Sequence, residues 1–189
     1  MEFIPLIKIK NRKILYAKEL LESIDESKII YVFYIDGIEK NKPNLCTFQK
    51  LSKNHELWVD PGPRDLGDIV DNFLTGASAI TIRSHLFPKI NPLNIREISE
   101  NKIFINDDFK KMNMDSLLLE KYDGFTLFIS REKIDQEYNY RNQLKNHISK
   151  STAYVYESNK DNINYWKNIG IENFLVNLNK YEEMKKRGF

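Results

Sequence analysis

Eight short runs of β-branched and aromatic residues recur along the chain, and their regular spacing constrains the fold more than any other feature. Each run is bounded by polar or turn-forming residues, as β-strands are. Successive runs begin roughly 20 to 28 residues apart, about the length of one strand, one helix and two short loops. The predicted strands cover residues 3–9, 29–35, 56–59, 79–82, 102–105, 125–129, 152–156 and 173–176.

The segments between these runs have the periodicity of amphipathic helices. In residues 67–75, Ile69, Val70, Phe73 and Leu74 recur at helical spacing, and Gly76 follows as a natural C-cap. The same pattern predicts helices over residues 17–25, 93–100, 115–122, 132–150, 162–169 and 179–187, and more weakly over residues 44–53.

Strict alternation of strand and helix predicts parallel strands joined by right-handed crossovers. Eight such units predict a closed (β/α)8 TIM barrel, because an open doubly wound sheet of this length usually has five or six strands. The barrel would be minimal, since such barrels typically take about 250 residues; an open or incomplete α/β sheet is the alternative. No linker or low-complexity stretch divides the sequence, so we expect one domain over residues 1–189.

Composition narrows the classes of partner. The formal net charge is only +2, so the basic footprint of a nucleic-acid-binding protein is absent. The single cysteine, Cys46, excludes an internal disulfide, and the dispersed histidines lack ligand spacing, so we expect neither a metal nor a cofactor. No apolar run approaches the length of about 18 residues that a membrane span needs, and the N-terminal apolar stretch is too short for a signal peptide. The sequence therefore predicts a cytoplasmic protein without membrane contact, and leaves its oligomeric state undefined.

Several strings in the first half of the chain occur in the order found in a known family. FIPLIKI (residues 3–9) resembles I-I-P-A-I-D, the opening strand of the HisA/HisF-like histidine-biosynthesis isomerases, and YIDGI (residues 34–38) is similar to their D-L-D-G-A. LWVDPGPRDLGDI (residues 57–69) and LTGASAITIRS (residues 74–84) are similar to V-G-G-G-I-R-S-x-E-D-V and L-x-A-G-A-x-x-V-V-I-G-T. The resemblance covers roughly residues 3–85 and implies the phosphoribosyl isomerase barrel that family members share.

The chain departs from this family at the positions that the resemblance would make functional. The family's catalytic aspartate positions match Lys8, Asn106 and Phe128, and of the glycines in its two phosphate-binding loops only Gly62 remains. An Amadori-type isomerisation needs one group to donate a proton and another to accept it. A loop without glycine holds its amides too far from a phosphate for close cradling. We therefore expect the sugar-phosphate isomerisation of the family to be lost.

Polar side chains at the C-terminal ends of the strands form the candidate site of such a barrel. Lys8 shares one strand face with Ile4 and Leu6, so we expect it on the lumen side, where it either binds an anion or pairs with an internal carboxylate. The two arginines either hold one phosphate or carboxylate or form an Arg–Asp network. The predicted catalytic residues are Lys8, Asp36, Asn106 and Asp107, and the predicted ligand-binding residues are Asp60, Gly62, Arg64, Arg83 and Ser84.

Two functions remain open from the sequence. The first is an enzyme or former enzyme, of the isomerase or lyase class, that binds or converts a small phosphorylated or carboxylated metabolite at the C-terminal face of the barrel. The second is a non-catalytic barrel that acts as a binding or assembly subunit. The resemblance favours the first and the departures favour the second, and the fold alone does not decide. We expect any bound anion between the ends of strands one, three and four, beside Lys8, Arg64, Arg83 or Ser84.

Overall fold

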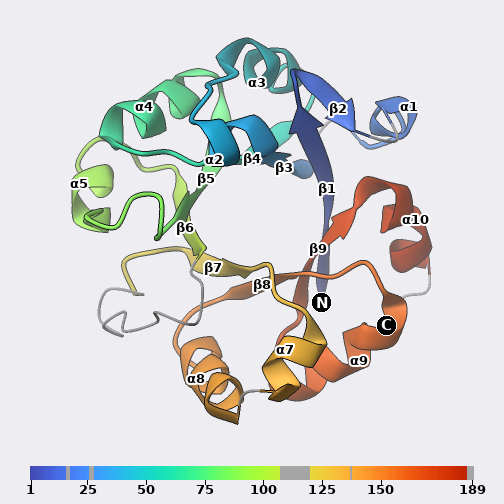
Figure 1. The fold of residues 1–189 in the computed structure, drawn as a ribbon. Helices are drawn as coiled ribbons and strands as arrows, with labels where there is room; N and C mark the ends of the chain where they lie inside the picture. The colour runs from blue at the N-terminus through green and yellow to red at the C-terminus, as the bar shows by residue number, and fades with distance from the viewer. Residues whose placement is uncertain (16–17, 26–27, 107–119, 137, 187–189) are drawn as a thin grey trace.

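The structure, a computed structural model, describes residues 1–15, 18–25, 28–106, 120–136 and 138–186. Within this part of the chain nine strands form one sheet, and eight parallel strands of it close into a ring, because β1 pairs with both β3 and β9 (Figure 1). The predicted barrel is thereby confirmed and the open sheet is excluded. The strands are β1 (Glu2–Lys10), β2 (Lys13–Leu15), β3 (Ile29–Tyr34), β4 (Glu56–Asp60), β5 (Ala77–Arg83), β6 (Lys102–Asn106), β7 (Gly124–Leu127), β8 (Ala153–Tyr156) and β9 (Asn173–Asn177).

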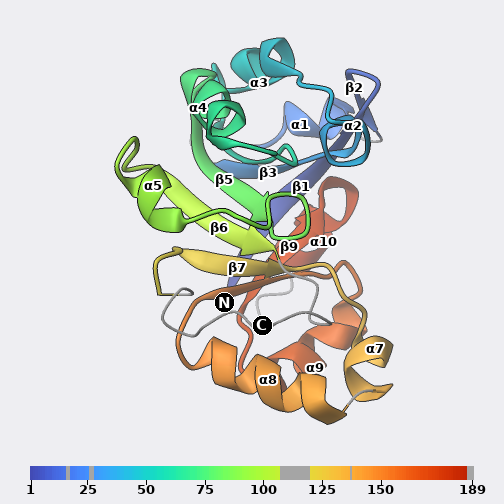
Figure 2. The ribbon, with the colours of Figure 1, turned by 60° about the vertical axis from the view of Figure 1, so that its left-hand side comes forward.

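Helices surround the ring on its outer side (Figures 1 and 2). None of the described helices combines the length and the apolar character needed to cross a bilayer. They are α1 (Lys18–Leu21), α2 (Ile35–Lys40), α3 (Leu45–Leu51), α4 (Leu66–Leu74), α5 (Pro92–Arg96), α7 (Arg131–Gln136), α8 (Tyr138–Ile148), α9 (Lys160–Ile169) and α10 (Leu178–Lys186).

Several helices differ from their predicted ranges. Among the described residues, the range predicted as one helix over residues 132–150 contains α7 and α8, and the range over residues 17–25 contains the short helix α1. The chain enters α2 at Ile35, one residue before the predicted end of the strand. Within α2, Gly37 passes close to the next loop, because a Cβ on it would lie 2.1 Å from the Pro61 carbonyl oxygen. Most of the helix predicted at residues 115–122 lies outside the described residues.

The first strand continues into a hairpin that the sequence analysis does not predict. Asn11 and Arg12 have positive φ angles of 49° and 61° and make a two-residue turn from β1 into β2. Because β3 lies along one edge of β1, the other edge is shared: β9 pairs with residues 2–6 and β2 with residues 8–10. The ring therefore closes only over the first half of β1.

The barrel strands are buried on both faces, which gives the molecule an outer and an inner core. Isoleucine and valine dominate the outer core, between the strands and the helices. The inner core is rich in aromatic rings: Trp58 stacks on Phe104 with centroids 3.9 Å apart, and Tyr31 and Tyr154 meet Trp58 edge-on at 5.0 and 4.8 Å. Side chains thus fill the middle of the lumen.

Tyr154 connects this inner core to the N-terminal face of the barrel. Its hydroxyl donates a hydrogen bond to Glu2 Oε2 at 3.4 Å. Burial, helped by the charge of Glu2, raises the pKa of Tyr154 from 10.0 to about 12. A folded-state pKa above the unfolded one gives stability that is complete below pH 10 and is lost as the pH rises towards 12.

We predict that Tyr154→Phe makes the alkaline loss of stability less steep. Between pH 10 and about 12 the wild-type protein keeps a proton on Tyr154 that its unfolded chain has lost, and the variant has no such group. Urea midpoints measured across this interval should fall less in Tyr154→Phe than in the wild type, although other buried tyrosines contribute to both curves. Parallel curves would contradict the prediction.

Candidate functional site

A buried ion pair joins the ends of two neighbouring strands inside the lumen. Asp60 ends β4 and is fully buried, and Arg83 ends β5 and is 8% exposed. Arg83 Nη2 lies 2.6 Å from Asp60 Oδ2, and its Nε lies 3.1 and 3.2 Å from the two carboxylate oxygens. Arg83 Nη1 donates to Asn106 Oδ1 at 3.1 Å, so the arrangement extends to the end of β6. These three predicted site residues therefore converge.

A second layer of polar side chains supports the pair from within the barrel. The Tyr31 hydroxyl lies 3.0 Å from Asp60 Oδ2 and 3.2 Å from Thr81 Oγ1, and Trp58 Nε1 donates to the same Thr81 oxygen at 2.8 Å. Burial, together with the charge of Asp60, raises the pKa of Tyr31 well above its ordinary value. The phenol therefore stays neutral and serves as a hydrogen-bond donor.

Aromatic rings flank the guanidinium of Arg83. It lies 5.1 Å from the ring centroid of Phe33 and 5.3 Å from that of Phe128, and Phe128 stacks in turn on Tyr156 at 5.3 Å. Such contacts stabilise a desolvated cation by about 2 kcal/mol or more. The end of the lumen is thus occupied by groups that satisfy one another.

Lys8 lies at the same end of the barrel, two strands away from Asp60, because β3 separates β1 from β4. Its Nζ donates to the Tyr156 hydroxyl at 3.1 Å and lies 4.9 Å from the centroid of that ring. Lys8 also lines a cavity of about 240 Å³, which we call the seam cavity because β2 and β9 separate there on the shared edge of β1. The seam cavity is lined by Leu6, Ile7, Lys8, Leu15, Asn177, Leu178 and Asn179.

Asp36 lies in α2, directly after β3, and Arg64 lies in the loop after β4. Asp36 is buried; it accepts the backbone N–H of Asn11 and pairs with Lys40 at 3.5 Å, so it fixes the β1–β2 turn. Arg64 donates to the carbonyls of Gly62 and Ile38 at 2.9 and 2.8 Å. These bonds join its own loop to α2.

Gly62 has a structural reason to be glycine. Its φ is +67°, and a Cβ there would lie 2.7 Å from the Cα of Ile38. The last predicted site residues are Ser84 and Asp107. Ser84 is half-buried, and its N–H donates to the backbone carbonyl of Asn106 at 3.0 Å. Asp107 lies outside the described residues.

No group of three or more His, Cys, Asp or Glu side chains suited to a metal ion occurs within the described ranges.

Glu157 follows β8 and lies just before α9, and it is not among the predicted site residues. Its Oε1 accepts the N–H groups of Ser158 and Asn159 at 2.9 and 2.8 Å, and its Oε2 accepts from Asn162 Nδ2 and Trp166 Nε1, both at 3.0 Å. The two backbone donors precede α9, which begins at Lys160, and the two side-chain donors come from α9 itself. Successive backbone N–H groups that converge in this way form an anion site. Here a carboxylate of the chain itself fills it. The sequence signal was an acidic residue three positions before the helix.

Comparison with known proteins supports the fold but does not assign the chain to a family. No family model and no curated protein matches the chain. The crystal structure of KGPDC from Streptococcus mutans, a TIM-barrel decarboxylase, is similar with a TM-score of 0.66 over 98% of this chain and 97% of that one. This chain is a TIM barrel. The two sequences are 13% identical, so the likeness concerns the fold alone, and the resemblance to HisA/HisF-like isomerases gains no support from it.

We predict that breaking the Asp60–Arg83 pair from one side is more harmful than removing both charges. Arg83→Met leaves a buried carboxylate without its cation and should lower the free energy of unfolding by about 3–5 kcal/mol. The double variant Asp60→Asn/Arg83→Met should recover part of that loss. Arg131→Met, which removes an exposed pair with Asp135, is the matched control and should change stability by about 1 kcal/mol or less. Additive losses in the double variant would contradict the prediction.

We also predict that Glu157→Ala opens an anion site at α9. The variant leaves backbone and side-chain donors without an acceptor, and should lose about 1–3 kcal/mol of stability. Sulfate should then raise its thermal midpoint more than it raises that of the wild type, with chloride at equal ionic strength as the reference. Equal sulfate responses in the two proteins would show that Glu157 does not occupy an anion site.

Proposed function

We propose that this TIM barrel binds a small phosphorylated or carboxylated metabolite in the seam cavity, with Lys8 as the anion-binding side chain. The observation that carries the proposal is that Lys8, on the inner face of β1, lines a cavity of about 240 Å³ towards the C-terminal end of that strand. TIM-barrel enzymes place their active sites at this face. The volume suits a ligand somewhat smaller than a drug-sized molecule.

The surroundings of Lys8 favour a negative charge. Helix α10 begins at Leu178, which lines the cavity, and no acidic residue lies in its first turn. The first amides of a helix lack partners within it, and its N-terminal end carries a partial positive charge. The amide side chains of Asn177 and Asn179 add donors for phosphate or carboxylate oxygens.

The other predicted cations are bound to partners within the protein. Arg83 donates to Asp60 and Asn106, and Arg64 donates to backbone carbonyls. Lys8 has three donors, and its hydrogen bond to Tyr156 uses one of them. We therefore propose that the anion lies between β1 and β9. The location expected from sequence was on the other edge of β1, towards β4 and β5.

A non-catalytic barrel is the second candidate function, and the filled lumen favours it. Asp60, Arg83 and Asn106 satisfy one another, and such mutual pairing leaves less charge for acid–base catalysis. Lys8 remains the group with access to a ligand, and its ammonium supplies binding energy and a proton donor. Binding without turnover of any phosphorylated sugar would distinguish this second function from an isomerase or lyase.

We predict that inorganic phosphate stabilises the wild-type protein and that Lys8→Met abolishes this effect. A ligand that binds only the folded state raises the midpoint of unfolding in proportion to its affinity, and calorimetry gives the affinity directly. Binding should weaken as sodium chloride is added, because the site is partly exposed.

Lys10→Met is the matched control. Lys10 is two residues further along β1, is paired with Glu39 at 3.8 Å and does not line the seam cavity. This variant should keep the phosphate response. Arg64→Met tests the location expected from sequence: a response lost in Arg64→Met and kept in Lys8→Met would overturn the placement, and no response in any protein would overturn anion binding.

A further inference from the structure

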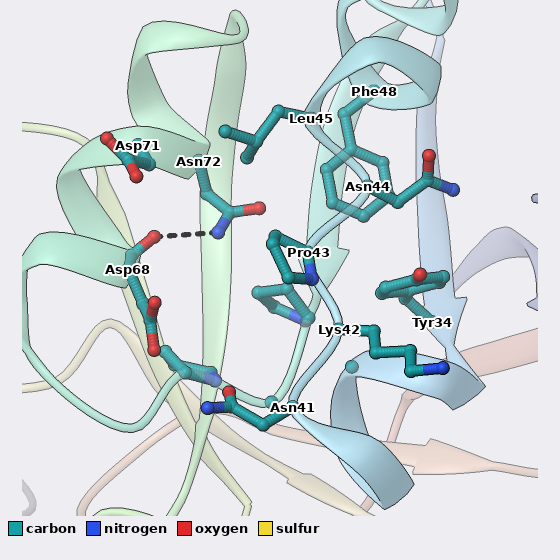
Figure 3. Close-up of a pocket in the computed structure, with 14 residues that line it drawn as sticks. Tyr34, Asn41, Lys42, Pro43, Asn44, Leu45, Phe48, Asp68, Asp71 and Asn72 are labelled. Atoms are coloured by element: carbon teal, nitrogen blue, oxygen red, sulfur yellow. Dashed lines mark hydrogen bonds between the residues drawn. The ribbon is translucent and has the colours of Figure 1, made fainter.

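A second cavity lies outside the barrel ring, between α4 and the segment that connects α2 to α3 (Figure 3). We call it the α4 cavity; its volume is about 130 Å³. One wall is the α2–α3 connection with the start of α3, and the opposite wall is α4. The loop after β4 closes one end. Its lining includes Tyr34, Pro43, Leu45, Phe48, Asp68 and Asn72.

Asn72 places a buried acceptor without a donor on the wall of this cavity. The side chain is 5% exposed, and its Nδ2 donates to the backbone carbonyl of Asp68 at 2.7 Å. Its Oδ1 is buried and has no hydrogen-bond partner among the described residues. Figure 3 shows the amide directed from α4 towards Pro43 and Leu45 across the cavity. Since an unpaired buried acceptor is unfavourable, a donor in the cavity would be stabilised.

The charge near Asn72 is negative. Asp68 is half-buried and lines the cavity one helical turn before Asn72; its Oδ2 accepts the N–H of Arg64 at 2.8 Å. Lys42 also lines the cavity, but Figure 3 shows its side chain directed away from Asn72 and towards Tyr34. A cationic hydrogen-bond donor would therefore interact favourably with both Asn72 Oδ1 and the Asp68 carboxylate.

The lining also includes Asn41, Asn44 and Asp71, and part of it is apolar. Tyr34 and Phe48 pack edge to face with centroids 5.5 Å apart, and Pro43 and Leu45 continue this surface. Such a wall accommodates a few methylene groups, and a cavity of 130 Å³ limits the ligand to a small molecule.

We infer that the α4 cavity binds a small molecule with a primary ammonium group on a short hydrocarbon chain. The ammonium donates to Asn72 Oδ1 and lies near the Asp68 carboxylate, and the chain packs against Phe48 and Pro43. This site is separate from the seam cavity, with which it shares no lining residue. It takes a cation, whereas the seam cavity is proposed to take an anion.

The test is a titration of the full chain with n-propylammonium chloride, followed by calorimetry and by amide NMR shifts. We expect saturable binding, with shifts concentrated in residues 41–45 and 68–72. Asn72→Leu removes the acceptor at similar size and should weaken binding about tenfold or more. Asp68→Asn can still accept from Arg64 N–H through its amide oxygen, and should weaken binding several-fold through the lost charge.

Glu39→Gln is the matched control, because Glu39 is an exposed carboxylate at the end of α2 that does not line the α4 cavity. Its affinity should match that of the wild type, as should that of Lys8→Met. The inference is overturned if Asp68→Asn binds as well as Glu39→Gln, if 1-propanol binds as tightly as n-propylammonium, or if no binding saturates. Tighter binding of Nα-acetyl-lysine amide than of n-propylammonium would instead assign the cavity to a lysine of a partner protein, and would also overturn it.

Discussion

The fully buried carboxylate of Asp60 is the constraint on which the inner half of the barrel depends. A charge inside an aromatic lumen is very unfavourable unless it is paired and hydrogen-bonded. Arg83 meets that requirement with several short hydrogen bonds, and the neutral Tyr31 hydroxyl donates a further hydrogen bond to the carboxylate. The two aromatic rings beside the guanidinium complete its surroundings. One buried charge thereby determines what most neighbouring side chains can do.

This arrangement also affects which polar side chains at the strand ends can contact a ligand. A TIM barrel usually collects its reactive groups at the C-terminal ends of the strands. Here Asp60 and Arg83 are held in one ion pair with Asn106, and Glu157 is held at α9 by donors of the chain itself. The two sites that we propose therefore lie where the regular alternation of strand and helix is broken. One is the seam beside β2, and the other is the connection between two consecutive helices, α2 and α3.

The sequence predicted the barrel because eight apolar runs at regular intervals leave few alternatives, and alternation along β1 placed Lys8 on the same face as Ile4 and Leu6. It left the arginines open between a ligand and an Arg–Asp network, because the partner of Arg83 lies 23 residues away, on another strand. The β2 hairpin was not predicted, because its turn residues, Asn11 and Arg12, do not include the glycine that usually marks such a turn. The four donors around Glu157 could not be predicted, because they converge only when α9 has formed.

The shared edge of β1 has a consequence for how the ring holds together. Its closure joins residues 2–6 to residues 173–177, the most distant segments of the chain to pair in the sheet. Contacts between such distant segments carry the largest loss of chain entropy and form slowly. The seam cavity lies where this closure ends, and β2 rather than β9 continues the wall. A molecule that bridges Lys8 and the start of α10 would act as a clasp between the two ends of the chain, so its binding and the closing of the ring would be one linked equilibrium.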